Sequence, residues 1–386
     1  MSPDGSASPV MLLSNGFQTE YEIGFTNGLA RAGISPLLIT SDKTPTERLD
    51  PQVLTCNLRG SQSTTRSAVT KVANILRYVA AYLIKSRTSG VRWVHVIGLF
   101  STASTVLSLL EAVGLRLVAP HFALTVHNLL PHDRHGTLNE WLYHLIYRLP
   151  DRLVVHTARA QRELMDRFGI PKSRIVVMEH GIDHLMPPSP ASGHWLREKY
   201  GILAEQPIIL FFGALAPYKG VDLLIEAFGQ MLEDSPAVLV IAGRCRDAGL
   251  HARLTALLRP FIDIRRAYWF DGFVAEEDVQ KYFHGSDLLV MPYRHIDQSG
   301  VIFMAMATGL PVVATDVGSL ADYVPLTAGA VVCPGDAAAL AQGMESMLAR
   351  LPQVDRLATV QRAESFLWLN TVRPLVGLYS QEVKNG

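Results

Sequence analysis

Residues 210–228 read LFFGALAPYKGVDLLIEAF, and this stretch decides the fold. An apolar run ends at Gly213, a short loop delivers Lys219, and an amphipathic pattern begins directly after Gly220. This order indicates a strand, a tight turn and a helix, the unit from which parallel sheets are built. Free backbone N–H groups at the start of the helix and the charge of Lys219 together suit a diphosphate. The alternative is an ordinary strand-to-helix turn with a surface lysine.

Short apolar runs alternate with helical patterns along most of the chain. Further strands are expected at residues 9–13, 35–39, 93–97, 122–126, 152–155, 208–212, 238–242, 288–291 and 312–315. Residues 186–193 read MPPSPASG and cannot continue a sheet, because proline lacks the backbone donor. The sequence therefore predicts an α/β protein of two Rossmann-like domains facing across a cleft, at residues 1–186 and 194–355, followed by a segment at 356–386.

A second strand-to-helix transition lies at residues 288–307. Ser299 and Gly300 precede a run of small apolar residues, so we expect them to open a helix. Two helix amino termini that converge on one place can neutralise a diphosphate without a metal ion. No Asp-x-Asp motif stands in a metal-like context, and we therefore expect neither a metal nor another cofactor.

Composition narrows the class of protein. The 386 residues carry no formal net charge, which does not favour a nucleic-acid partner, and the three cysteines are too scattered for a disulfide framework or a metal site. The amino terminus lacks a secretory pattern and no apolar run is long enough to span a bilayer, so a cytoplasmic protein is expected.

The charge is unevenly distributed along the chain. Residues 51–110 contain no acidic side chain but several arginines and lysines, and residues 69–84 have a basic amphipathic pattern. Such a helix can lie on anionic lipid at the inner face of the cell membrane, with Trp141, Tyr143 and Tyr147 as further anchors if they share that face. The alternative is a solvated helix that covers a sheet.

Several of these segments together resemble a known family. They are Phe-Phe-Gly to Tyr-Lys-Gly at 211–220, Ala-Gly-Arg at 242–244, Gln-Ser-Gly-Val at 298–301, Gly-Leu-Pro-Val-Val-Ala-Thr at 309–315, Thr-Val-His-Asn at 125–128 and Glu-His-Gly-Ile-Asp at 179–183. The set resembles retaining glycosyltransferase family 4, of the two-domain B fold, and in particular its bacterial polysaccharide-assembly members. The final stretch resembles the closing helix of that family, which crosses back to the first domain.

The resemblance assigns roles to individual residues. His127 and Lys219 are expected to be catalytic, and His132 and His180 to contact the acceptor. The expected donor-binding residues are Gly16, Gly213, Lys219, Gly220, Gly243, Arg244, Gly272, Phe273, Asp297, Gln298, Ser299, Gly300 and Val301. For His127 the alternative is a loop histidine bound by the backbone, whereas His95 and His156 lie within apolar runs and are expected to be core residues.

The resemblance implies transfer of a hexosyl group from a nucleoside-diphosphate sugar to a hydroxyl acceptor, with retention of configuration. The acceptor implied is a lipid-linked saccharide. The sequence departs from the family at Met304, where a glutamate is usual, and in the absence of a second basic residue before Lys219, a charge that Arg244 or Arg294 would have to supply. The alternatives are a nucleotide-sugar epimerase or sugar phosphorylase on the same fold, or a non-catalytic partner subunit that binds nucleotide sugar.

Overall fold

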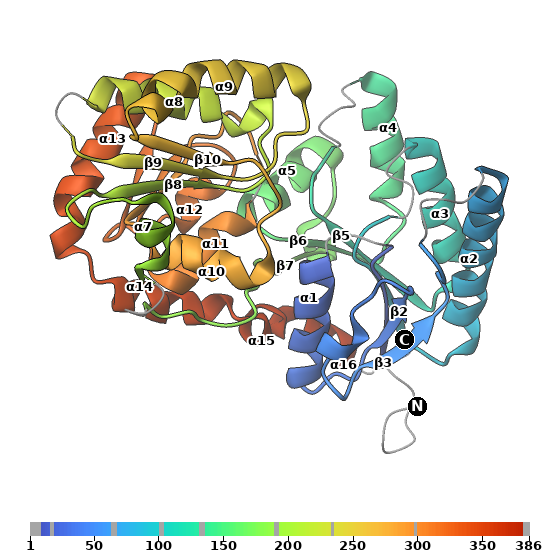
Figure 1. Cartoon of the computed structure of the whole chain (residues 1–386). Coiled ribbons are helices and arrows are strands. Elements are labelled where there is room, and N and C mark those ends of the chain that lie inside the picture. The colour runs from blue at the N-terminus through green and yellow to red at the C-terminus, as the bar shows by residue number, and fades with distance from the viewer. Residues whose placement is uncertain are drawn as a thin grey trace. The chain divides into compact units, whose positions relative to one another are not determined.

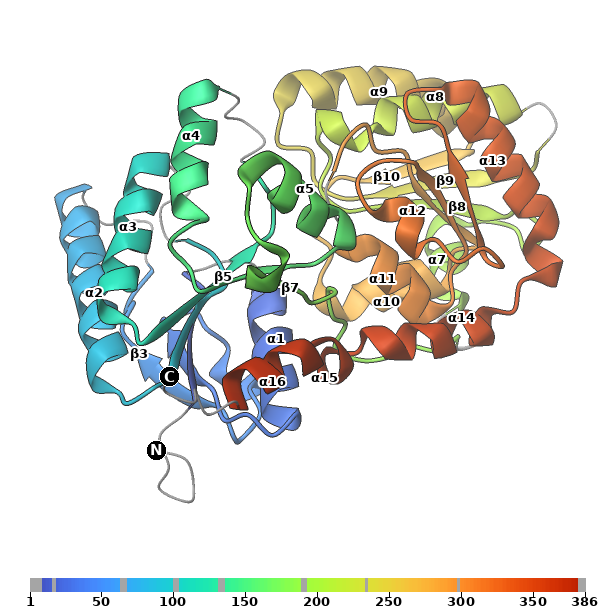
Figure 2. The same ribbon diagram turned by 180° about the vertical axis from the view of Figure 1, so that it is seen from behind.

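The computed structural model describes residues 9–15, 19–62, 68–99, 104–130, 136–188, 193–232, 235–296 and 299–380. The chain divides into two compact units: unit 1 is Met1–Asp183 with Phe366–Gly386, and unit 2 is His184–Ser365. Each unit has its own parallel β-sheet with helices packed on it (Figures 1 and 2). The prediction of two Rossmann-like α/β domains is confirmed.

Unit 1 has a seven-stranded sheet in the order β3-β2-β1-β4-β5-β6-β7. Its strands are β1 (Val10–Leu13), β2 (Leu37–Thr40), β3 (Leu54–Asn57), β4 (Trp93–Val96), β5 (His121–Val126), β6 (Arg152–Val155) and β7 (Ile175–Val177). Strands β1 to β3 follow one another toward one edge of the sheet, and strands β4 to β7 follow one another toward the other edge. The switch between β1 and β4 is where open α/β sheets leave room for ligands at the carboxyl ends of their strands.

Helices cover both faces of this sheet. On the face of Val10 and Leu12 lie α1 (Thr19–Arg31), α15 (Trp368–Thr371) and α16 (Arg373–Ser380). On the face of Met11 and Leu13 lie α2 (Ala68–Thr88), α3 (Thr105–Val118), α4 (Thr137–Ile146) and α5 (Ala158–Phe168). Because successive residues of a strand point to opposite faces, a strand covered on both sides must be apolar throughout, as β1 is.

Unit 2 has a six-stranded sheet in the order β10-β9-β8-β11-β12-β13. Its strands are β8 (Ile208–Phe212), β9 (Val238–Ala242), β10 (Ala267–Phe270), β11 (Leu288–Met291), β12 (Val312–Thr315) and β13 (Gly329–Val332). Its helices are α7 (Trp195–Tyr200), α8 (Val221–Met231), α9 (Ala248–Asp263), α10 (Glu276–His284), α11 (Gly300–Thr308), α12 (Leu320–Tyr323), α13 (Ala337–Arg350) and α14 (Arg356–Ala363). Here the strand order switches between β8 and β11.

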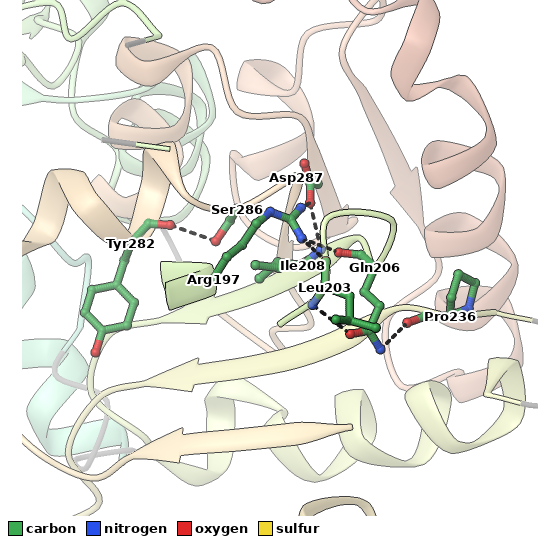
Figure 3. A network of polar contacts seen from close by, with 8 residues as sticks. All are labelled: Arg197, Leu203, Gln206, Ile208, Pro236, Tyr282, Ser286 and Asp287. Atoms are coloured by element: carbon green, nitrogen blue, oxygen red, sulfur yellow. Dashed lines mark hydrogen bonds and ion pairs between the residues drawn. The ribbon is translucent and has the colours of Figure 1, made fainter. Parts of the chain in front are cut away.

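A polar network fixes the amino ends of β8 and β11 (Figure 3). Arg197 on α7 donates to the carbonyl oxygens of Leu203, at 2.6 Å, and Gln206, at 2.8 Å, and pairs with Asp287 at 2.9 Å. The Asp287 carboxylate also accepts the backbone N–H of Ile208, at 2.8 Å. Because Asp287 directly precedes β11 and Ile208 begins β8, the network joins α7 to both central strands.

The C-terminal segment returns to unit 1, as predicted. The ring of Trp368 fills a slot lined by three glycines of that unit, Gly24, Gly28 and Gly181. A Cβ atom at Gly24 would lie 2.1 Å from Trp368 Nε1, and one at Gly181 would lie 2.1 Å from Trp368 Cδ2. Only residues without a side chain leave room for the indole ring.

The return begins later than the predicted boundary at residue 356. Residues 356–365 belong to unit 2, where Arg356 Nε donates to the carbonyl oxygen of Gly309 at 3.1 Å and α14 packs on α11. The division between the units at the other crossing falls after Asp183, a few residues before the proline-rich segment.

Candidate active site

Three loops of unit 2 meet at the carboxyl ends of β8, β9 and β11. A Cβ atom at Gly243 would lie 1.9 Å from the carbonyl oxygen of Gly213, and one at Gly220 would lie 2.0 Å from that of Pro292. Gly220 also has a φ of +64°, which L-residues rarely adopt. These glycines were predicted to contact the donor. Because these glycines have no side chain, they allow the neighbouring loops to pack closely against one another.

Lys219 is a buried cation at the end of a short 3-10 turn, Pro217–Lys219. It is 8% exposed, and its Nζ lies 4.0 Å from the centroid of the Tyr293 ring and 5.4 Å from that of Tyr218. Burial lowers the pKa of Lys219. No carboxylate pairs with this amine in the part of the chain that the structure describes, where it lies against the faces of two tyrosine rings. A bound anion would satisfy it.

The second predicted phosphate loop lies beside this lysine. Ser299 is buried at the N-cap of α11, but its side chain does not cap the helix, and its Oγ lies 3.5 Å from the hydroxyl of Tyr293. Val301 Cγ2 lies 3.9 Å from the position of a Cβ on Gly213. Tyr293 therefore links Lys219 to Ser299, and α11 starts next to the loop that follows β8.

Arg294 does not supply the second positive charge at this site. Its guanidinium donates to both carboxylate oxygens of Asp222, at 2.8 and 3.0 Å, and to the carbonyl oxygen of Pro217. Burial would raise the pKa of Asp222, but the hydrogen bonds and charge of Arg294 outweigh it and hold that pKa below its usual value. Arg294 thus fastens the turn that carries Lys219, and Arg253 adds a second ion pair to Asp222 at 2.9 Å.

Three further predicted donor residues, Arg244, Gly272 and Phe273, lie on the loops after β9 and β10. Arg244 is exposed, and Phe273 is 86% exposed on the loop that begins at Asp271 and Gly272. The Asp271 carboxylate accepts the backbone N–H of Cys245, at 2.9 Å, which ties the two loops together. Asp297 and Gln298 lie outside the described residues.

Three histidines of unit 1 gather at the carboxyl ends of β5, β6 and β7. His127 follows β5 and His156 follows β6, and because Val126 pairs with Val155 in the sheet, the two histidines are neighbours. His127 Nδ1 and His156 Nε2 are 3.2 Å apart. The ring of Tyr21, from α1, packs edge-on against His127, His156 and His180, with centroids 4.9, 5.4 and 5.4 Å away.

The bonds of these rings fix where their protons lie. His127 Nε2 donates to the carbonyl oxygen of Ile97 and His156 Nδ1 to that of Met178, each at 2.8 Å. When both rings are neutral, the two nitrogens that face each other therefore carry a lone pair and no proton. This contact becomes a hydrogen bond only when the pair holds one additional proton.

Burial opposes that additional proton. It lowers the pKa of His156 to about 3 and of His180 to about 4, and it places the pKa of His127 well below its usual value. His156 is 4% exposed, whereas His127 is only half-buried and keeps one side accessible. The pair is therefore neutral at pH 7 unless a negative charge lies beside it.

The other predicted residues of unit 1 have different outcomes. His95 is a core residue, as predicted, and its ring nitrogens contact Tyr379 Oη at 2.5 Å and Thr125 Oγ1 at 2.7 Å. His156 is buried, as predicted, but its contact with His127 was not. Gly16 and His132 lie outside the described residues.

No functional role was predicted from the sequence for Tyr293 or Tyr21, and His156 was predicted to be a core residue only. A usable signal existed for His156, because it follows its strand directly, as His127 does on the adjacent strand. Tyr293 stands in a loop whose path depends on neighbouring loops, and no local pattern distinguishes it.

Both halves of the chain match families of glycosyltransferase domains. Residues 23–184 match the family described as Glycosyltransferase Family 4, and residues 206–350 match Glycosyl transferases group 1. The first match lies within unit 1 apart from its last residue, and the second lies within unit 2.

Curated relatives include a D-inositol 3-phosphate glycosyltransferase of Geodermatophilus obscurus, which is 32% identical over 238 residues, or 60% of this chain and 52% of that protein. A mannosylfructose-phosphate synthase of Agrobacterium fabrum is 29% identical over 183 residues, or 46% of this chain and 40% of that protein. The matched region thus spans about half the length of the first of these relatives.

Solved glycosyltransferase structures share the fold. A glycosyltransferase of Rickettsia africae matches with a TM-score of 0.76 at 19% identity, covering 98% of both chains. HepE of Anabaena, solved in complex with UDP, matches with a TM-score of 0.74 at 17% identity, covering 96% of this chain and 98% of that one. The predicted glycosyltransferase B-type fold is therefore confirmed.

Proposed function

We propose that this chain is a glycosyltransferase that moves a hexosyl group from a nucleoside-diphosphate sugar to a hydroxyl acceptor, with the donor held by unit 2. The observation that carries the proposal is Lys219, a buried cation without a carboxylate partner among the described residues, beside the start of α11. Both domain matches support the proposal, as does HepE, a solved structural neighbour that holds UDP.

The chemistry needs negative charge stabilised on the departing diphosphate. Lys219 would supply a full charge, and the backbone N–H groups at the start of α11 would supply partial ones. Arg294 and Asp222 would act indirectly, by holding the turn that positions Lys219. Among the described residues no cluster of three or more His, Cys, Asp or Glu side chains could hold a metal ion, and metal independence remains a prediction.

His127 would act on the sugar or the acceptor. Its half-buried ring stands at the carboxyl end of β5, where groups of such sheets meet ligands. A negative charge on a ligand bound at the His127–His156 pair would favour the additional proton that turns their contact into a hydrogen bond. Retention of configuration is part of the proposal and rests on the family resemblance.

Two classes of acceptor compete. A lipid-linked saccharide follows from the resemblance to polysaccharide-assembly enzymes and would place the chain at a membrane surface. No helix in the described ranges is both long and apolar enough to cross a bilayer. A phosphorylated polyol or sugar is favoured by the names of the curated relatives, which act on inositol 3-phosphate or form mannosylfructose-phosphate.

The donor half of the proposal is tested by thermal unfolding of the full chain with UDP, GDP and ADP and with their sugar conjugates. A nucleoside diphosphate should raise the midpoint, and residues 184–365 expressed alone should show the same preference. The fragment extends to residue 365 because α14 packs on α11. The assignment would be contradicted if no nucleotide raised the unfolding midpoint of the full chain. It would also be contradicted if nucleotides raised that midpoint but not the midpoint of residues 184–365.

Turnover assays separate the competing functions. Transfer should require an acceptor, and polyprenyl-diphosphate sugars can be compared with inositol phosphate and hexose phosphates. Conversion of the nucleotide sugar without acceptor would indicate an epimerase, and a requirement for inorganic phosphate would indicate a phosphorylase. Donor binding without turnover on any acceptor would favour a non-catalytic partner subunit.

A further inference from the structure

The outward sides of α2, α3 and α4 in unit 1 expose large apolar side chains. Six of them, each more than half exposed, define what we call the apolar face: Leu76, Ile84, Leu107, Leu110, Leu117 and Trp141. Leu117 reaches 80% exposure. A helix that covers a sheet normally turns polar side chains outward, because only its inner stripe is buried. On α3 the inner residues Ala112 and Leu115 are buried, and the outer residues are also mostly apolar.

The three helices form one continuous surface. α3 contacts α2 on one side and α4 on the other, and all three turn their inner sides to the same core, through Tyr78, Tyr82, Leu115 and Ile146. Figures 1 and 2 show them side by side. Their outer sides therefore point away from the sheet together, and the apolar residues are not scattered singly.

The charges on the exposed sides of α2 and α3 have one sign, and the partly exposed Glu140 of α4 pairs with Arg167. Arg77 and Arg87 are exposed on the same stripe of α2 as Leu76 and Ile84. The only acidic residue within α2 and α3 is Glu111, which is buried and accepts hydrogen bonds from Asn15 and Tyr82. The exposed sides of these two helices thus combine aliphatic side chains with cations and carry no carboxylate.

We propose that the apolar face docks on the surface of an anionic lipid bilayer. The leucines would enter the boundary of the acyl chains, while the arginines, whose stems are apolar, would reach the lipid phosphates. Trp141 would lie at the level of the headgroups. A second copy of the chain fits less well, because self-association through α2 and α3 would bring the arginines of both copies together, and the exposed sides of these two helices have no carboxylate to offset them. This inference adds a membrane location to the proposed function. It rests on that function in one respect, because transfer to a lipid-linked acceptor requires docking of this kind.

The structure corrects the predicted aromatic anchors. Tyr147 is buried and donates to the carbonyl oxygen of Leu129, at 2.6 Å, and Tyr143 is partly buried against the core. Of the three predicted aromatic residues, Trp141 alone lies on the exposed side of α4. The docking surface consists mainly of aliphatic residues on α3, which the basic pattern at residues 69–84 did not indicate.

Co-sedimentation with vesicles tests the proposal. The full chain should bind vesicles of equal parts phosphatidylglycerol and phosphatidylcholine at low salt, and bind pure phosphatidylcholine much more weakly. The variant L107Q/L110Q/L117Q should lower the partition coefficient at least about tenfold. R77Q/R87Q should lower it about thirtyfold and weaken its dependence on salt. Leu326→Gln, which changes an 87% exposed leucine of unit 2, is the matched control and should bind as the unaltered chain does.

Three results would overturn the proposal. The first is failure to bind anionic vesicles at low salt. The second is binding that the arginine variant abolishes and the leucine variant leaves intact, which would make the attraction purely electrostatic. The third is a dimer in light scattering that the leucine variant dissociates, without vesicle binding. Vesicle binding by a chain that shows no transfer would keep this inference and reject the proposed function, whereas transfer to a water-soluble acceptor should be equal in all variants.

Discussion

At the scale of single residues, Lys219 carries the clearest prediction. Lys219→Met keeps most of the apolar stem against Tyr293 but removes the charge. If the amine binds the diphosphate, donor affinity should fall by about 1.5–3 kcal/mol, the usual range for a hydrogen bond to a charged group. Isothermal titration with the nucleoside diphosphate measures this loss.

The control for Lys219 is Lys172→Met, which removes a charge from an exposed lysine of unit 1. It should leave the affinity unchanged. Equal affinities for both variants, with equal thermal midpoints, would place Lys219 outside the donor site.

His127→Ala should lower kcat roughly 100-fold while changing the KM for the donor far less, because the ring is proposed to act on the reacting groups. His144→Ala removes a partly buried histidine that packs on Phe168 and serves as the control. Steady-state kinetics on the soluble fraction separates the two effects. A lower thermal midpoint with unchanged kcat would leave His127 as a structural residue.

The site residues that could be predicted from the sequence are those that follow the end of a strand. Lys219, Ser299 and His127 all follow buried strands, and the structure places each at a carboxyl edge of its sheet. Arg294 could not be placed in advance, because its partner Asp222 is 72 positions away and comes close only when the loops after β8 and β11 meet. Packing of one loop against another leaves no local pattern.

At the scale of elements, the slot for Trp368 is the most constrained contact. Gly24→Ala puts a methyl group 2.1 Å from the Nε1 atom of this indole, so either α1 or α15 must shift. We expect unit 1 to lose about 1–3 kcal/mol, as for other overpacked cores. Thermal unfolding measures the loss, and limited proteolysis should show cleavage near residue 365.

Gly377→Ala is the matched control, because it lies in α16 and nothing stands within 4 Å of its added Cβ. It should be neutral or stabilising by up to about 1 kcal/mol, owing to the helix propensity of alanine. If both variants unfolded at the same temperature, the indole ring would not occupy this slot.

The Arg197 network should matter for stability and not for donor binding, since it lies at the amino ends of β8 and β11 (Figure 3). Arg197→Met removes the donor to two carbonyl groups and the cationic partner of Asp287, which keeps only the backbone N–H of Ile208, and should cost about 2 kcal/mol. Arg259→Met, which breaks an exposed pair with Asp263 on α9, should cost well under 1 kcal/mol. Denaturant unfolding compares the two, and a similar cost for both would contradict the role given to Arg197.

The strands predicted from sequence are the nine internal strands of the two sheets, and the four that were not predicted, β3, β7, β10 and β13, are the four edges. Internal strands are buried on both faces and read as continuous apolar runs. Edge strands are partly exposed, as in Leu54–Asn57, where half-buried and exposed positions alternate. Their composition overlaps with that of loops, so pattern alone does not find them.

At the scale of the whole molecule, the buried histidines make unit 1 sensitive to acid. Burial lowers the pKa of His95 and His156 to about 3 and of His180 to about 4, while an unfolded histidine titrates near 6.5. Below pH 6.5 the unfolded chain takes up protons that the folded chain refuses, so the stability present above that pH is lost as the pH falls toward 4. Each histidine contributes about 1.4 kcal/mol per pH unit in this window.

Calorimetry between pH 7 and pH 5 tests this prediction. The transition of unit 1 should move to lower temperature, and the double variant H95Q/H156Q should flatten its dependence on pH. The transition of residues 184–365, which lack these three histidines, should move less. If the midpoint temperature of the unit 1 transition stayed constant over this range, these rings would be accessible to water and not buried.

The discontinuity of unit 1 also sets an order of events during synthesis. Residues up to Asp183 leave the ribosome first, but the indole that fills the slot on α1 is made only after the whole of His184–Ser365. Unit 2 is one uninterrupted stretch and can fold while the slot is still vacant. Until residues 366–380 are made, the slot on α1 stays open to solvent, and in that interval we expect the nascent first unit to be a target for chaperones.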